Sequence, residues 1–389
     1  MTIPAGVTRW GFPTSVWFGA GVSAELANAV AALGAKRPLL VTDRGLAGSP
    51  MVADALSRLD RADLAPRLFC DVKPNPTASN VEAGIRALEA GHHDLVIAWG
   101  GGSGMDAAKA IALMAGQHAP MWDFEDVGEN WKRVDSEAML PVIAVPTTAG
   151  TGSELGRSSV ITDEQGGRKV IIFHPKMLPD LVLMDPGLTV GLPRHLTAAT
   201  GMDALTHALE AYCAPSFHPM AEGLALQALT MIKEHLPRAC ANGADIDARA
   251  QMMVASGMAC VALQKGLGAV HALAHPLGAL YDAHHGLLNA VLLPYVLRFN
   301  MPVLAPKLTR LAGILDLRSR TPAAVLDWVL ALRREIGIPD HLRAIGIDSS
   351  RSAEVAALAE RDPCAGGNPI PLTQPILASI FDSAVAGSL

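Results

Sequence analysis

Short apolar runs alternate with helical patterns through the first half of the chain. Three runs bounded by turn residues are typical of buried strands: 37–43, 93–99 and 141–146. Three segments between and before them have the spacing of helices that bury one face: 20–33, 51–59 and 78–90. Strands and helices in alternation predict an α/β domain built on a parallel sheet.

The pattern changes after Asp185, Pro186 and Gly187. From about residue 193 onward the segments are long, rich in Ala, Leu and Met and helical in spacing, without convincing strands. A chain of 389 residues also exceeds the roughly 250 to 300 residues at which single cores stop growing. We therefore predict an α/β domain over residues 1–189 and an all-helical domain over residues 190–389.

The composition restricts the partners and the cellular location that we expect for the protein. The net charge of −6 predicts no nucleic-acid partner, and charge-free stretches such as 250–264 fall short of the roughly 20 residues of a membrane span. Five scattered cysteines without a CxxC pair argue against a disulfide framework or a thiolate metal site. The first residues lack the basic and apolar regions of a secretory signal, so we expect a cytoplasmic protein.

The helical half contains a candidate metal site. Asp203 and His207 are one helical turn apart, His271 and His275 have the same spacing, and His285 follows a turn. One carboxylate and two or three imidazoles suit iron(II) or zinc and leave positions open for water or substrate. An open metal site indicates catalysis.

Each of these residues also has a structural alternative. Asp203 follows Thr200 at the spacing of a capping box, and a single histidine on an apolar helix is usually a core residue. Several such residues together are costly to bury unless a cation organises them, which favours the metal site. His284 is an alternative to His285, and Glu210 either supports the site or lies exposed.

A glycine-rich turn follows the strand at 93–99. In the sequence WGGGSGMDAAK, residues 99–109, glycines allow backbone amides to approach a phosphate at the start of a helix. The alternative is a tight turn, since the spacing is not that of the GxGxxG motif. Asp43 ends an early strand, where a carboxylate binds an adenosine ribose and repels a 2′-phosphate, or where it serves only a turn.

A third stretch, VPTTAGTGSE at 145–154, also follows a predicted strand. Open α/β sheets bind ligands at this edge, so the stretch is a candidate lining of the cofactor site. From the residues alone, hydrogen bonds of its threonines to the local backbone are the preferred interpretation.

Together these segments resemble the iron-containing (group III) alcohol dehydrogenase family. The resemblance covers nearly the whole chain and rests on GGGSGMDAAK, PTTAGTGSE, GMDALTHALEAY and HALAHPLGALYDAHHGLLNAVLLPYV, with PNPT at 74–77, DPGLT at 185–189 and NPIPLT at 368–373. The separation of 14 positions between His271 and His285 also matches the family. It implies a Rossmann-like NAD-binding domain, a helical metal-binding domain and a homodimer or larger assembly.

The resemblance also assigns roles to residues. It implies Fe²⁺, with Zn²⁺ as the other candidate, bound by Asp203, His207, His271 and His285. It places His275 near the nicotinamide as a candidate catalytic proton carrier. The cofactor, NAD rather than NADP, is expected at the following residues: Asp43, Gly101, Gly102, Ser103, Asp106, Thr147, Thr148 and Lys169.

The implied function is hydride transfer between NAD(H) and a small alcohol or aldehyde at the metal. A lyase resembling dehydroquinate synthase, in which NAD is used transiently, is the alternative. Such an enzyme needs a basic cluster for a phosphorylated substrate, and only Lys265 and Arg298 lie near the ligand segments in the sequence. A metal-binding protein without activity would leave the glycine-rich turn unexplained.

Overall fold

The protein divides into two compact units. The computed structural model describes residues 11–12 and 14–389. One unit comprises residues 14–148 and Gly152–Gly191, and the other comprises Leu192–Leu389 together with residues 11–12 and Ala149–Thr151. The sequence pattern placed the boundary at 189/190 and gave no sign that the short Ala149–Thr151 segment packs with the helical unit.

The first unit is built on a six-stranded parallel sheet with the order β1-β8-β5-β4-β2-β3. The predicted strands form as β2 (Pro38–Val41), β4 (Leu95–Gly100) and β5 (Val142–Pro146), and they are buried throughout. The remaining strands are β1 (Ser15–Phe18), β3 (Arg67–Phe69) and β8 (Leu181–Met184). Burial on both faces explains why β2, β4 and β5 appear in the sequence as continuous apolar runs.

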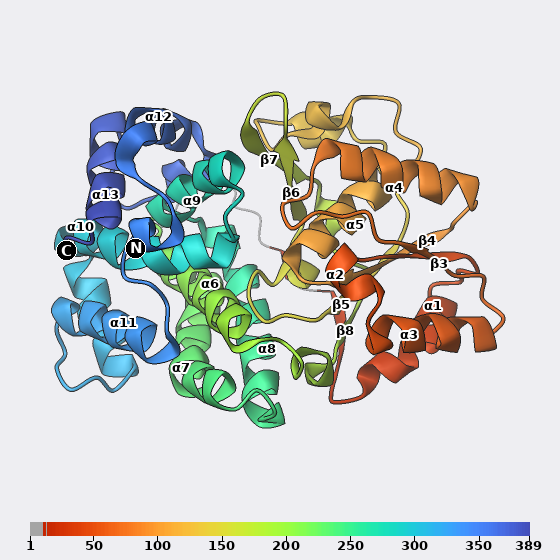
Figure 1. The fold of residues 1–389 in the computed structure, drawn as a ribbon, viewed down its shortest axis with the longest axis horizontal. Helices are drawn as coiled ribbons and strands as arrows, with labels where there is room; N and C mark the ends of the chain where they lie inside the picture. The colour runs from red at the N-terminus through yellow and green to blue at the C-terminus, as the bar shows by residue number, and fades with distance from the viewer. Residues whose placement is uncertain (1–10, 13) are drawn as a thin grey trace. The chain divides into compact units, whose positions relative to one another are not determined.

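Helices cover both faces of this sheet. In Figure 1, α1 (Leu26–Ala32) and α3 (Pro50–Arg61) lie on one side and α4 (Ala78–Ala90) and α5 (Gly102–Met114) on the other. The helix predicted over 20–33 begins as a 3₁₀ turn, Val22–Glu25, before α1. The predicted α/β class is therefore confirmed.

An antiparallel hairpin was not predicted. It consists of β6 (Ser158–Asp163) and β7 (Arg168–Phe173), which form a separate two-stranded sheet. Its strand β6 packs against α5, which lies well before the hairpin in the sequence.

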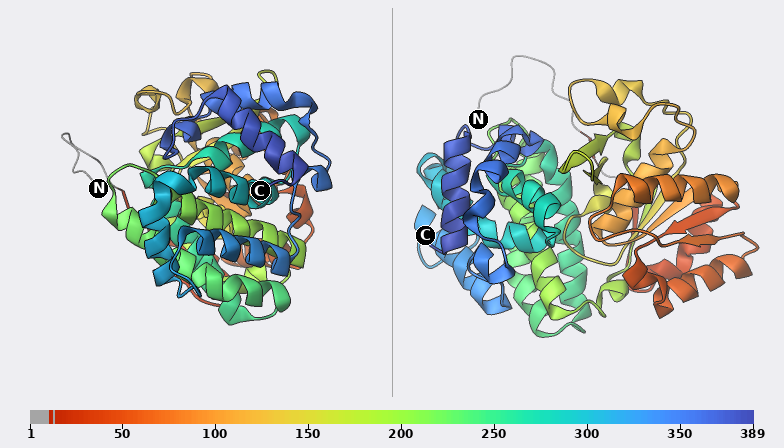
Figure 2. Two further views of the ribbon diagram at one scale, coloured as in Figure 1. Left: turned by 90° about the vertical axis from the view of Figure 1, so that its left-hand side faces the viewer. Right: turned by 45° about the horizontal axis from the view of Figure 1, so that its top comes forward.

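The second unit is helical, as predicted. Its helices are α6 (Arg194–Cys213), α7 (Pro219–Ala241), α8 (Ile246–Ala262), α9 (Ala269–Tyr281), α10 (His285–Ile314), α11 (Pro322–Ile336), α12 (Ser352–Arg361) and α13 (Gln374–Ala386). The central α6 packs against α7, α8 and α10, and Figure 2 shows α12 and α13, in blue, side by side.

By length and composition alone, α10 is the one unbroken helix of the described chain that would suffice to cross a membrane. Two-thirds of its apolar window, 67%, is buried inside the protein, as is typical of a core helix.

Candidate metal centre and cofactor loop

The middle of α6 supplies two candidate ligands. Asp203 and His207 lie one turn apart on a helix that is buried on almost every side from Thr197 onward. The capping alternative for Asp203 is wrong, because α6 begins nine residues earlier, at Arg194. The hydroxyl of Thr200 instead donates to the carbonyl of Leu196.

The starts of α9 and α10 supply the other two. His271 lies in the first turn of α9, and His285 is the first residue of α10. Its neighbour His284 is the N-cap of α10, where its Nδ1 accepts a hydrogen bond from the N–H of Leu287. The cap therefore orients the chain so that His285, rather than His284, joins the cluster.

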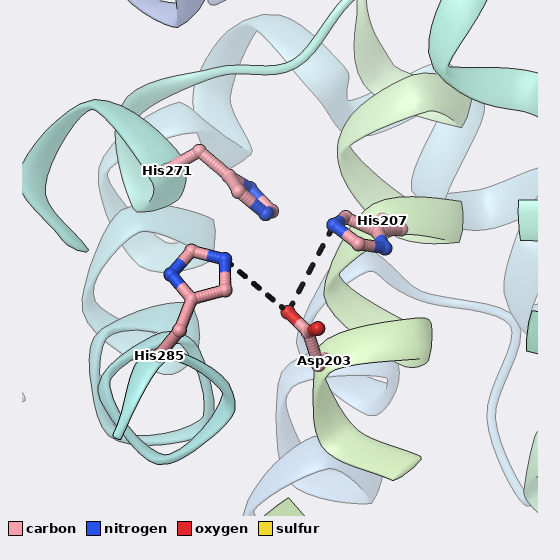
Figure 3. A group of neighbouring side chains, drawn as sticks. All are labelled: Asp203, His207, His271 and His285. Carbon is pink, nitrogen blue, oxygen red and sulfur yellow. Dashed lines mark ion pairs between the residues drawn. The ribbon is translucent and has the colours of Figure 1, made fainter. Parts of the chain in front are cut away.

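The four side chains converge, as Figure 3 shows. One donor atom from each residue lies within 4.8 Å of all the others. The Asp203 Oδ1 atom is 3.8 Å from Nε2 of His207 and 3.7 Å from Nε2 of His285. Donor atoms around a tetrahedral zinc-sized cation are roughly 3.4 Å apart. These separations therefore fit a cation better than direct hydrogen bonds.

The electrostatic surroundings suit metal binding. Burial lowers the pKa of His207 to about 4, so this imidazole is neutral and offers a lone pair at neutral pH. Burial also acts to lower the pKa of His271, but the hydrogen bond and charge of Glu210 outweigh it and raise that pKa. The Oε2 atom of Glu210 is 2.7 Å from Nδ1 of His271, which directs Nε2 towards the cluster.

His275 lies one turn beyond His271, with its ring centroid 5.5 Å from that of His285. Its Nδ1 atom is 2.8 Å from Oδ2 of Asp362. Burial acts to raise the pKa of Asp362, but the charge and hydrogen bond of His275 and the N–H of Cys364 outweigh it, so the pKa is lowered. Asp362 is therefore an ionised partner for His275.

The glycine-rich turn joins β4 to α5 in the α/β unit. Gly101 is the N-cap of α5, and Gly102 and Ser103 form its first turn, so backbone N–H groups are presented at the positive end of the helix. A Cβ atom on Gly101 would lie 3.2 Å from the methyl group of Thr148. The N–H of Thr147 donates to the carbonyl of Gly100 over 2.9 Å. The two threonines therefore line the glycine-rich turn.

Asp43 performs the turn role that the sequence left open. Its Oδ1 atom accepts from the N–H groups of Gly45 and Leu46 at 2.7 and 3.0 Å and caps the short helix α2 (Arg44–Ala47). Within residues 14–389, no hydrogen bond reaches Oδ2, which faces Gly100 of the glycine-rich turn. The carboxylate can therefore cap α2 and still accept a bond from a ligand.

Two other predicted cofactor residues make contacts within the protein. Both oxygens of Asp106 are used, one by the hydroxyl of Ser153 at 2.5 Å and one by the N–H of Val160 at 3.0 Å. The Nζ atom of Lys169, on β7, donates to Oδ1 of Asn75 over 2.9 Å. Asp106 thus holds the hairpin to α5, and its role toward a cofactor stays a prediction, as does that of Lys169. The hydroxyl of Ser103 donates to the carbonyl of Pro74.

Comparison with known proteins decides the family. Residues 13–186 match the iron-containing alcohol dehydrogenase family, and residues 197–385 match the C-terminal domain of the same family. The chain belongs to the iron-containing alcohol dehydrogenase family. The predicted resemblance is confirmed, and the protein is an oxidoreductase.

Several members of this family are similar over almost their full length. The lactaldehyde reductase of Escherichia coli K12 is 34% identical, covering 95% of this chain and 97% of the relative. The NAD-dependent methanol dehydrogenase of Bacillus methanolicus is 36% identical, covering 97% of this chain and all of the relative. A crystal structure of a 1,3-propanediol oxidoreductase superposes with a TM-score of 0.92 at 34% identity, covering 97% of this chain and 100% of the other.

Sequence reasoning missed, or gave too little weight to, three residues around the candidate metal centre. Glu210 is buried, so the exposed alternative is wrong. Asn289 places its amide nitrogen 2.7 Å from Oδ1 of Asp203 and 3.1 Å from Nε2 of both His271 and His285. Asn289 lies one turn beyond His285 in an apolar stretch, a signal that could have singled it out.

The third is Thr151, whose hydroxyl donates to Oδ2 of Asp203 over 3.2 Å. It belongs to the Ala149–Thr151 segment, and the carbonyl of Gly150 in this segment accepts from Ser256 on α8. The PTTAGTGSE stretch therefore serves both units, with its first threonines beside the glycine-rich turn and its last beside Asp203.

Proposed function

We propose that the protein is a metal-dependent, NAD-linked alcohol dehydrogenase and aldehyde reductase for small substrates. The observation that carries the proposal is the convergence of Asp203, His207, His271 and His285 in a chain of this family. When bound, a divalent cation there supplies Lewis acidity at a substrate oxygen, and NAD(H) exchanges the hydride.

The residues of the site have different roles in the proposed reaction. The three imidazoles hold the cation by neutral donors, while the single carboxylate of Asp203 contributes its charge and is itself held by Asn289 and Thr151. His275 exchanges the proton of the substrate hydroxyl, a role that is typically worth roughly 100- to 10,000-fold in rate.

We propose iron(II) as the metal, with zinc as the other candidate, since one oxygen and three nitrogen donors suit both. We propose NAD over NADP because Oδ2 of Asp43 faces the glycine-rich turn, where it would bind ribose hydroxyls and repel a 2′-phosphate. An Asp43→Gly variant should lose much of its preference for NAD, and an unchanged ratio of kcat/KM for NAD and NADP would assign Asp43 to the turn alone.

The lyase alternative has less support. Of the two basic residues near the ligand segments in the sequence, Lys265 is buried and donates to the carbonyls of Tyr212 and Ala214 at the end of α6. The ammonium group of Lys265 therefore bonds to the carbonyls at the end of α6 and is not available to a phosphorylated substrate. The relatives described above are named as dehydrogenases and reductases.

The test begins with protein purified without oxygen and analysed for bound metal. After loading with Fe²⁺ or Zn²⁺, a panel of short alcohols, diols and aldehydes is assayed by NADH absorbance. We expect net NADH formation with an alcohol, which a lyase would not give. His271→Ala should lose metal and activity together, while His195→Ala, at an exposed position of α6, should lose neither. Metal-independent turnover would refute the proposal.

We further propose a cytoplasmic dimer. All five cysteines are thiols, which suits a reducing compartment. The strand β1 lies at an edge of the sheet and exposes Val16 and Phe18, apolar side chains that a second copy could cover.

A further inference from the structure

The helix α9 holds two histidines that are each bonded to a buried carboxylate. Nδ1 of His271 lies 2.7 Å from Glu210, and Nδ1 of His275, one turn later, lies 2.8 Å from Asp362. The carboxylates come from different parts of the unit, one from α6 and one from the chain after α12. His271 belongs to the four-residue candidate ligand set, whereas His275 lies with Asp362 and Cys364 in a separate cluster. The second carboxylate therefore serves a histidine outside the four-residue set.

Asp362 is held firmly at its own end. It is the N-cap of the 3₁₀ turn Pro363–Gly367, and its Oδ1 atom accepts from the N–H of Cys364 over 2.8 Å. Only 7% of its side chain is exposed. One oxygen is thus fixed by the backbone, and the other is directed at His275.

The far end of the same segment is also fixed. Asn368 exchanges two amide hydrogen bonds with Asn300 of α10, at 2.8 and 3.0 Å, and accepts from the N–H of Ala269 at the start of α9. A Cβ atom on Gly367 would lie 2.1 Å from the carbonyl of Leu267, so the segment lies directly against the chain that enters α9. The segment 362–368 therefore binds the first turn of α9 at one end and His275 at the other.

We propose that Asp362 is a positioning residue that fixes the rotamer and tautomer of His275. The Nδ1–H of His275 donates to Asp362, so Nε2 is the atom that exchanges protons with substrate. This inference rests on the proposed function, in which His275 is the proton carrier. It adds a residue from the C-terminal part of the chain to the catalytic arrangement.

The proton balance is simple. Oxidation of an alcohol by NAD releases one proton in addition to the hydride. Nε2 of His275 accepts that proton from the hydroxyl, becomes doubly protonated and passes the proton to solvent, and in the reductive direction it delivers a proton to the carbonyl oxygen. The Nδ1–H bond and the ionised carboxylate of Asp362 are unchanged throughout.

The kinetic test compares the two carboxylates in metal-loaded protein. Asp362→Asn keeps the shape but offers Nδ1 an amide, so we expect kcat to fall roughly 100-fold while KM and metal content stay near those of the wild type. Asp362→Glu should recover part of kcat. Glu210→Gln should instead weaken metal binding by roughly 10- to 100-fold, and excess metal should restore its kcat. A kcat for Asp362→Asn within about threefold of the wild type, or loss of metal from that variant, would overturn the proposal.

A spectroscopic test does not depend on activity. In zinc-loaded protein with ¹⁵N-labelled histidine, the signal absent from a His275→Gln variant identifies His275. We expect that signal to show a proton on Nδ1 in the wild type and a shift to the other tautomer in Asp362→Asn. An unchanged tautomer contradicts the inference even if the protein proves to have no dehydrogenase activity, whereas the expected shift without any NADH formation would contradict only the proposed function.

Discussion

The pKa of the Glu154 carboxyl group is affected more by burial than by neighbouring charge. Its side chain lies in the α/β unit with 3% exposure, and burial raises its pKa to about 7, against the smaller effects of its own N–H and of Lys109. The ammonium of Lys109 instead donates to the carbonyls of Ser153, Gly156 and Ser158. Within the described chain, Oε1 of Glu154 has no hydrogen-bond partner.

This burial predicts a dependence of stability on pH. The pKa is about 7 in the folded protein against an ordinary value of 4.5, so the folded state keeps the proton over a range in which the unfolded state has lost it. The contribution is fully present below about pH 4.5, falls as pH rises, and by pH 8 the loss approaches about 3 kcal/mol. Glu154→Gln carries no charge at any pH. We expect it to match the wild type near about pH 5 and to unfold at higher denaturant concentration near about pH 8.

The control for this measurement is Glu89→Gln, at an exposed position of α4, which should leave the pH profile unchanged. Parallel profiles of the wild type and Glu154→Gln would show that Glu154 is ionised in the folded protein.

At the residue scale, the sequence indicated the candidate metal ligands but not the carboxylates that bond to the histidines. Asp203 and His207 were predictable because their spacing places them on one face of a helix. Asp362 and Glu210 contact histidines 87 and 61 residues away in the sequence. No local periodicity encodes such pairings, since they depend on how α6, α9 and the chain after α12 pack.

At the scale of elements, the geometry of the candidate metal centre depends on close packing between α6 and the start of α10. A Cβ atom on Gly286 would lie 2.6 Å from the carbonyl oxygen of Ala199 and 3.2 Å from Cβ of Asp203. Glycine therefore allows α10 to begin directly against α6, with His285 as its first residue.

Gly286→Ala should force these helices apart. We expect a loss of about 1 to 3 kcal/mol in the free energy of unfolding and weaker metal binding, because His285 moves with the helix end. Metal titration and urea unfolding measure the two effects. The matched control is Gly313→Ala near the end of α10, where the nearest atom to a new Cβ is Nε of Arg320 at 3.6 Å, so neither property should fall. If Gly286→Ala binds metal like the control, the contact is not what sets the position of His285.

Elements were predictable where burial was uniform. The strands β2, β4 and β5 are buried on both faces, and their continuous apolar runs made them visible. The β6–β7 hairpin was not, because its strands are only partly buried and Asp106 and Lys109 of α5 hold its backbone. These tertiary contacts leave no periodic signal in the hairpin itself.

At the scale of the whole molecule, the change from an alternating to a purely helical pattern predicted the two units. It did not predict that a short segment of the first half packs with the helical unit. The Ala149–Thr151 segment joins the helical unit, although residues on both sides belong to the α/β unit. A Cβ atom on Gly150 would lie 2.7 Å from Cβ of Thr200, so a glycine is required for the segment to lie against α6. Two further chain connections, before Ala149 and after Thr151, thus join the unit with the glycine-rich turn to the unit with the candidate metal centre.

The proposed dimer is tested at the strand β1. This strand pairs with β8 on one side, and within residues 14–389 no strand pairs with its other side. Phe18 is 49% exposed and Val16 is 36% exposed, so an apolar edge faces outward.

Phe18→Lys places a charge where a second copy would bury the phenyl ring, and burial of an unpaired charge is costly. We expect sedimentation to give twice the chain mass of 40.7 kDa for the wild type and about that mass for Phe18→Lys, with the metal retained. Val303→Lys, at an apolar position of α10 that is 55% exposed, should remain dimeric. If Phe18→Lys also remains dimeric, the copies meet through another surface.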